Sequence, residues 1–295
     1  WEVEQPLIVP RGYRLYIGAG TQLNFAPGAA LSANGPVEFA GSEAAPVELL
    51  AATDAGWPGM VVMEAGAESS LTHVIVRDTT SVVLEGWTLT GGVNFYASDV
   101  ILADSLFVNS RGEDALNIIQ SKFAITNLEI RGTASDAFDA DFASGSIDGG
   151  AFVDIGKAGG GDAIDVSGSQ IEVRGTRFEN VSDKALSVGE RSSMQAEMVI
   201  IKSTGTGAAA KDGSELSLSD SVIDNASFAG LTAYIKKPEY GPARIEAQGV
   251  RIVAAETPVL VQTGSRVALD GVAADTEDVD VDALYETIMK PGLRK

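Results

Sequence analysis

Asp162-Ala-Ile-Asp-Val166 is the clearest of five similar segments that decide the fold of this chain. The other four are Asp114-Ala-Leu-Asn-Ile118, Asp136-Ala-Phe-Asp-Ala140, Lys184-Ala-Leu-Ser-Val188 and Ala208-Ala-Ala-Lys-Asp212. The five segments start 22, 26, 22 and 24 residues apart, and a second alternating run follows most of them, as in Ile171 to Phe178. Alternation with a period of two indicates strands and excludes helices. The sequence is therefore a repeat of short strands.

The repeat length and the missing helices leave one architecture. A leucine-rich repeat would need a Leu/Asn ladder that is absent here, and a propeller blade would need a period of roughly 40 residues. We therefore predict an all-β, right-handed parallel β-helix solenoid over residues 1–275, with coils stacked ~4.8 Å apart. Residues 276–295 are predicted to be a tail with a short helix, because Val281, Leu284, Tyr285 and Ile288 form a helical stripe.

Composition narrows the range of partners. The chain has 295 residues, 45% of them hydrophobic, and a formal net charge of −20. Such a charge repels phosphate backbones and anionic membrane surfaces, so we expect no nucleic-acid partner. No apolar run is long enough to span a bilayer, and membrane insertion is not expected. The chain has no cysteine and begins at Trp1, and we expect it to be a piece of a longer protein.

Stacking turns columns of the sequence into rows in space. A small outward row is predicted from Ala115, Ala137, Ala163, Ala185 and Ala209. A polar outward row is predicted from Asn94, Asn117, Asp139, Asp165, Ser187 and Lys211. The turn before these strands gives a third row, made of Asp114, Asp136, Asp162 and Lys184. One face of the solenoid therefore combines alanines with a wall of carboxylates that becomes basic in later coils.

The carboxylates on this face suggest a cation site. Asp139 and Asp165 are expected ~5 Å apart on neighbouring coils, and Asp141 lies two residues from Asp139 on the same side. Carboxylates this close repel one another unless a cation lies between them. Ca²⁺ prefers oxygen ligands, so Asp139, Asp141 and Asp165 are candidate calcium ligands. The alternative is structural, because Asp and Asn in turns often bond to the backbone.

Two reactions fit this set of residues. Hydrolysis of a glycosidic bond needs two carboxylates, which the aspartates can supply. β-Elimination on a uronic acid polymer needs a cation and a base, for which Lys211 and Lys184 are the candidates. Neighbouring carboxylates raise the pKa of a lysine and weaken it as a base. The alternative for each lysine is a salt bridge, to Asp183 or Asp212.

Further side chains are candidates for contacting a substrate. Asn117, Asp139 and Ser187 belong to the polar row, and Arg191 lies near its basic end. Tyr234 is a candidate for stacking on a sugar ring. These five residues complete the predicted substrate-binding set.

Several motifs resemble known β-helix proteins. The opening pattern Leu15 to Pro27, with Trp57-Pro-Gly59, is similar to the first coils of many bacterial β-helices. Glu113-Asp-Ala-Leu-Asn-Ile118, Gly161-Asp-Ala-Ile-Asp-Val-Ser-Gly168 and Lys236-Lys-Pro-Glu-Tyr-Gly-Pro242 resemble a module of larger bacterial envelope proteins, some similar to spore-coat kinase-like proteins. The resemblance implies a pectate-lyase-like fold and an extracellular, periplasmic or cell-envelope location. Polysaccharide lyases and polygalacturonases are similar more distantly, but the Gly-His-Gly and Arg-Ile-Lys motifs of polygalacturonases are absent.

Two hypotheses about function follow. The first is an extracytoplasmic groove that handles a polysaccharide; as an enzyme it would be a calcium-assisted polysaccharide lyase or a glycoside hydrolase. The second is a non-catalytic structural or partner-binding module that contacts a neighbouring domain of its parent protein. A carboxylate groove open to solvent favours the first hypothesis. Rows that are covered by the C-terminal helix favour the second.

Overall fold

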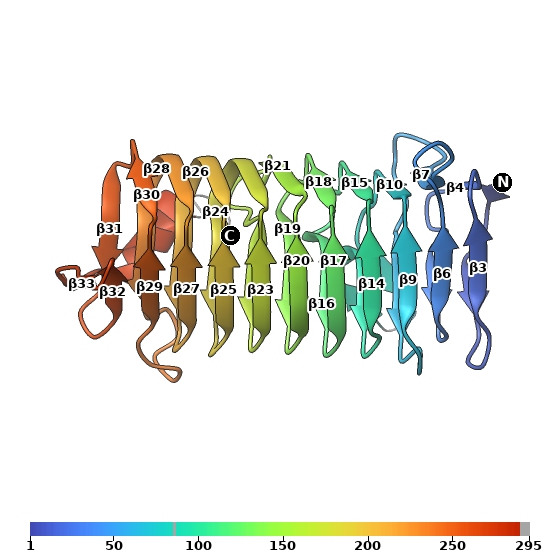
Figure 1. The fold of residues 1–295 in the computed structure, drawn as a ribbon. Helices are drawn as coiled ribbons and strands as arrows, with labels where there is room; N and C mark the ends of the chain where they lie inside the picture. The colour runs from blue at the N-terminus through green and yellow to red at the C-terminus, as the bar shows by residue number, and fades with distance from the viewer. Residues whose placement is uncertain (85–86, 290–295) are drawn as a thin grey trace.

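The structure is a computed structural model that describes residues 1–84 and 87–289, which form a right-handed parallel β-helix of about 11 turns. Each turn adds strands to three parallel ladders, and the turns stack in chain order from one end to the other (Figure 1). The predicted fold is confirmed. Among the described residues, no helix is long and apolar enough to cross a membrane.

The ladders differ in which part of the coil they contain. The first ladder contains β1 (Glu2–Val3), β4 (Gln22–Phe25), β7 (Val47–Ala51), β10 (Val74–Arg77), β15 (Leu106–Val108), β18 (Glu129–Arg131), β21 (Ala151–Ile155) and β30 (Arg251–Val253). The second ladder contains β2 (Leu7–Val9), β5 (Leu31–Ala33), β8 (Met60–Met63), β13 (Gly91–Tyr96), β16 (Asp114–Ile119), β19 (Asp136–Asp141), β22 (Ile164–Ser167) and β31 (Thr257–Val261). The long strands β24 (Arg177–Gly189), β26 (Ile200–Lys211) and β28 (Val222–Tyr234) run through both ladders.

The third ladder forms the face that is turned to the viewer in Figure 1. It contains the parallel strands β3 (Leu15–Gly18), β6 (Val37–Ala40), β9 (Ser69–Thr72), β14 (Val100–Ala103), β17 (Lys122–Thr126), β20 (Ser144–Asp148), β23 (Gln170–Arg174), β25 (Ser193–Glu197), β27 (Glu215–Ser219), β29 (Arg244–Gln248) and β32 (Arg266–Leu269). The short strand β33 (Val272–Ala273) ends this ladder and pairs with β32 antiparallel.

The core fills the space between the ladders. Leu116, Phe138, Ile164 and Leu186 stack in register on the second ladder, and none has measurable exposure. Burying each such side chain stabilises the fold by about 1.5–3 kcal/mol. The predicted solvent-facing alanine floor is wrong: Ala115, Ala137, Ala163 and Ala185 are buried in the main hydrophobic cluster, and Ala209 is buried elsewhere, beside Tyr234.

The predicted polar row is correct over five coils, beginning with Asn94 of β13, which pairs with Asn117, and it is wrong at the sixth. Asn117, Asp139, Asp165 and Ser187 are direct neighbours on β16, β19, β22 and β24. Ser187 then pairs with Ala209, so Lys211 belongs to the next outward row. Lys184 pairs with Thr206, which is 22 residues later, whereas the predicted repeat aligned it with Ala208. The error arises in the run of alanines from 208 to 210, because alanine fits inward and outward positions equally well.

Two segments fold back onto the outward face of the second ladder. The hairpin of β11 (Val82–Leu84) and β12 (Trp87–Leu89) packs Val82 and Leu89 against Val61 of β8. Near the other end lie α1 (Val281–Leu284) and the π-helical turn η1 (Tyr285–Met289). Asp280 caps α1 by accepting a hydrogen bond from the backbone of Ala283. Together α1 and η1 form the C-terminal tail, whose Val281 and Tyr285 side chains pack on Ala209 and Tyr234.

Candidate carboxylate site on the second ladder

Four outward side chains remain partly exposed between the hairpin and the C-terminal tail. These are Asp139 and Asp141 on β19 and Asp165 and Ser167 on β22, here called the carboxylate window. Thr90, just after the hairpin, contacts Asn117 of β16 on one side, and Tyr285 lies over Lys184 of β24 on the other. Three strand spacings separate β16 from β24, which gives the window a length of roughly 14 Å along the solenoid.

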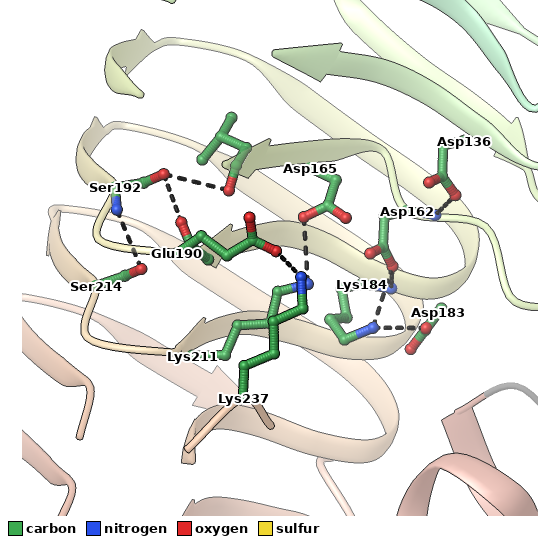
Figure 2. Close-up of polar contacts among 12 residues, drawn as sticks. Asp136, Asp162, Asp165, Asp183, Lys184, Glu190, Ser192, Lys211, Ser214 and Lys237 are labelled. Carbon is green, nitrogen blue, oxygen red and sulfur yellow. Dashed lines mark hydrogen bonds and ion pairs between the residues drawn. The ribbon is translucent and has the colours of Figure 1, made fainter. Parts of the chain in front are cut away.

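Asp165 is paired with a lysine. Lys211 Nζ lies 3.3 Å from Asp165 Oδ1, as Figure 2 shows. The lysine comes from β26 and passes over Gly189, where a β-carbon would lie 2.8 Å from Lys211 Cε. A larger residue at position 189 would crowd the lysine on this path. Burial opposes ionisation of Asp165, but the ammonium groups of Lys211 and Lys184 outweigh it and lower the pKa of Asp165.

The neighbouring carboxyl groups respond in the opposite way. Burial, together with the charges of Asp114 and Asp165, raises the pKa of Asp139 well above its usual value. Burial and the charge of Asp165 also raise the pKa of Asp141. Two side chains that face each other in register on adjacent strands, Asp139 and Asp165, therefore favour different protonation states.

Asn117 and Asp114 form the hairpin side of the window. Asn117 Nδ2 donates to Asp114 Oδ2 at 3.1 Å and to Thr90 Oγ1 at 3.0 Å. Burial raises the pKa of Asp114 to about 6. Asn117 is only 3% exposed, and within the described parts of the chain its Oδ1 has no hydrogen-bond donor.

The turn row has a structural role. Asp136 Oδ1 accepts from the backbone N–H of Asp162 at 2.8 Å, and Asp162 Oδ1 accepts from that of Lys184 at 2.9 Å. Lys184 Nζ lies 2.6 Å from Asp183 Oδ2 and 3.4 Å from Asp162 Oδ1, with the lysine 1% exposed (Figure 2). The predicted salt bridge to Asp183 is therefore found. Each aspartate fastens one coil to the next.

Neither lysine has the properties of a general base. Burial acts to lower their pKa values, but Asp162 and Asp183 raise the pKa of Lys184 well above normal, and Asp165 raises that of Lys211. A base must be neutral at the working pH, and these ammonium groups keep their protons. The catalytic role predicted for Lys211 and Lys184 is not supported, and Lys211 instead positions and ionises Asp165.

Three predicted substrate contacts are not available in this conformation. Tyr234 is 2% exposed, with its hydroxyl 2.8 Å from that of Tyr285, so it cannot stack on a sugar. Ser187 is fully buried between Asp165 and the tail, and Asn117 is nearly so. Arg191 is exposed, and its guanidinium carbon lies 5.6 Å from the centre of the Tyr240 ring.

Sequence reasoning missed an exposed aromatic residue beside the window. Phe142 follows Asp141 directly, is 67% exposed, and lies against Gly168 of the next coil. Its left-handed backbone, with φ of 51°, repeats at the equivalent turn of other coils, where Gln120 and Glu190 stand. The turn therefore requires the backbone conformation but no aromatic ring. An aromatic residue at an otherwise polar turn was the feature of the sequence that could have identified Phe142.

The calcium prediction remains untested. Among the residues that the structure describes, no three Asp, Glu or His side chains converge on a point where they would hold a metal ion. Asp165 points its carboxylate to Lys211, which leaves only two aspartates of the predicted three for a cation. The arrangement thus does not fit the predicted ligand set, and we derive no step through calcium.

A separate groove of about 620 Å³ lies at the corner between the first and second ladders. Its lining includes Asp54, Asp78, Arg111 and Lys157, and none of the window residues. The window is a surface strip, whereas this groove is a cavity remote from the paired carboxylates.

Comparison with known proteins supports the fold. No family model and no curated protein matches the chain. Among solved structures, a mutant of the periplasmic alginate epimerase AlgG matches with a TM-score of 0.55 and 10% identity, covering 93% of this chain and 77% of that one. An exopolygalacturonase from Thermotoga maritima matches with a TM-score of 0.52 and 12% identity, covering 90% and 92%. The bacteriophage CBA120 tailspike protein 2 matches with a TM-score of 0.50 and 8% identity, covering 85% and 48%.

At these identities the likeness shows the fold alone, which is the right-handed parallel β-helix. The comparisons give no support to the resemblance to spore-coat kinase-like proteins.

Proposed function

We propose that this chain handles a polysaccharide at the carboxylate window and hydrolyses a glycosidic bond there, in an extracellular or periplasmic setting. The observation that carries the proposal is the Asp139–Asp165 pair, whose pKa values are moved in opposite directions. Two titratable groups that are separated in this way are suited to acid and base roles. The structural neighbours include an alginate epimerase and an exopolygalacturonase, which is consistent with a carbohydrate substrate.

Each residue of the window has a role in this proposal. Asp139 keeps its proton and donates it to the leaving oxygen of the glycosidic bond. Asp165, ionised by Lys211, faces the anomeric carbon as a nucleophile or as the base for a water. Neighbouring strands place the two backbones ~4.8 Å apart, which is closer to the ~5–5.5 Å carboxyl separation of retaining enzymes than to that of inverting ones. Phe142 offers an apolar face for a sugar ring.

Elimination by a lysine base receives less support than hydrolysis, because both lysines are held protonated by their aspartate partners. A non-catalytic carbohydrate-binding or partner-binding module is the second candidate. The observation that favours it is that the hairpin and the C-terminal tail cover the two ends of the polar row, and Ser187 and Tyr234 are buried at the tail end.

The test is the release of reducing ends from a panel of polysaccharides by wild type, Asp139→Asn, Asp165→Asn and the control Asp220→Asn. Asp220 is an exposed turn aspartate far from the window, so its variant should keep full activity. We expect the two window variants to lose at least ~100-fold in rate while still binding the glycan. Unsaturated products would instead indicate elimination. Binding without turnover in wild type would favour the non-catalytic module.

A further inference from the structure

The window presents hydrogen-bond acceptors and few free donors. In the described chain, Asp139 and Asp141 make no hydrogen bond or ion pair. The neighbouring Asn117 is buried and spends its amide N–H groups on Thr90 and Asp114, so it offers the window no donor. A ligand that contacts the carboxylate of Asp141 must therefore bring its own donors.

The cations near the window are already engaged. Lys211 is paired with Asp165, and Lys184 with Asp183 and Asp162. Lys237 pairs with Glu190 at the end of β24, and Arg191 lies over the ring of Tyr240 (Figure 2 shows the lysine pairs). A uronic acid carboxylate would therefore be repelled by the unpaired carboxylate of Asp141, and the lysines near the window already have acidic partners.

Asp141 and Phe142 together fit a different substituent. Asp141 is partly exposed, and the ring of Phe142 stands in solvent directly after it. A carboxylate beside an aromatic face attracts an ammonium group through charge and through the ring quadrupole. The other charges that act on Asp141 are Asp165 and Glu190, both paired with lysines, and the ammonium group of Lys237, which is held by Glu190.

We propose that the substrate of this site is a polysaccharide that carries free amino groups, with Asp141 receiving the ammonium and Phe142 stacking on the same sugar. The inference rests on the proposed function and adds the substrate class to it. Asp141 is then a specificity-determining residue, whereas Asp139 and Asp165 act on the bond itself. A uronic acid polymer is excluded by the same arrangement of charges.

The experiment measures binding of three matched oligosaccharides by calorimetry: a glucosamine oligomer with charged amines, its N-acetylated counterpart, and a galacturonate oligomer. Wild type, Asp141→Asn and the control Asp220→Asn are compared. We expect wild type and the control to prefer the glucosamine oligomer by about tenfold over the acetylated one. Asp141→Asn should reduce that preference to about twofold or less, with acetylated binding unchanged.

The outcomes separate the two proposals. A preference that persists in Asp141→Asn would reflect the overall charge of −20 and would overturn the assignment of Asp141. Tighter binding of the galacturonate oligomer would overturn the substrate class while leaving carbohydrate handling intact. If none of the three oligomers binds and no polysaccharide of the panel is cleaved, the proposed function fails together with the inference.

Discussion

At the scale of single residues, the pairing of Lys211 with Asp165 controls the charge of the window. The lysine reaches the aspartate from two coils away, across the space that Gly189 leaves open. Lys211 is mostly buried, so removal of its charge leaves Asp165 without its ion-pair partner in a poorly hydrated place. One residue thus links the stability of three coils to the protonation of one carboxyl group.

We predict that Lys211→Met lowers the free energy of unfolding by about 3 kcal/mol at neutral pH, because it leaves a largely buried charge unpaired. The pKa of Asp165 should rise, which moves the acid limb of the activity profile to higher pH. Denaturant titration and the pH–rate profile measure the two effects. The double variant Lys211→Met/Asp165→Asn should recover part of the lost stability. No recovery would show that the lysine acts through packing.

At the scale of elements, the C-terminal tail acts as a cover. Tyr285 contacts Tyr234 through its hydroxyl and lies over Lys184 and Lys236, with ammonium-to-ring distances of 5.5 and 4.3 Å. The tail is short, and among its side chains whose burial the structure describes, Val281 and Tyr285 are buried. Its attachment therefore depends on a few contacts, whereas each coil is held by a full ladder.

We predict that Tyr285→Ala detaches the tail without unfolding the solenoid. Hydrogen exchange should speed up at the ends of β26 and β28, and global stability should fall by no more than about 2 kcal/mol. The variant Asp282→Asn, at an exposed position in the same tail, is the matched control and should leave exchange unchanged. Exchange that rises uniformly along all coils would contradict this local picture.

At the scale of the whole molecule, the acidic window destabilises the fold as pH rises. Burial raises the pKa of Asp114, Asp139 and Asp141, so the folded chain binds more protons than the unfolded chain above pH ~4. For Asp114, the folded chain no longer binds an extra proton once the pH exceeds its folded pKa of about 6. Asp165 acts in the opposite sense, because its lowered pKa gives stability that is lost in acid.

We therefore predict that Tm is highest near pH 4 and falls from there towards pH 7, with a second fall in stronger acid. Asp114→Asn should flatten the decline between about pH 4 and 6, because it removes the group that titrates there. Calorimetric scans over this range in wild type and variant measure both effects. A Tm that rises steadily from about pH 5 to pH 7 would contradict the raised pKa values.

The sequence alone was sufficient for the coil, its period and part of the site. Regular spacing and two-residue alternation place Asn117, Asp139 and Asp165 side by side, because a parallel ladder converts a repeat directly into neighbours in space. The turn row was recognisable for the same reason. Its backbone-capping role follows from the short side chain of aspartate, which can bond to nearby N–H groups.

Only the tertiary structure decided which part of the polar row is exposed. The hairpin after β10 and the tail after β33 fold back over the second ladder, and neither belongs to the repeat, so no column of the sequence predicts where they lie. The position of Lys211 was lost in a run of alanines, whose small side chains carry no inward or outward preference. The opposite protonation of Asp139 and Asp165 likewise depends on burial and on a lysine 46 residues distant, which only the folded chain brings to 3.3 Å.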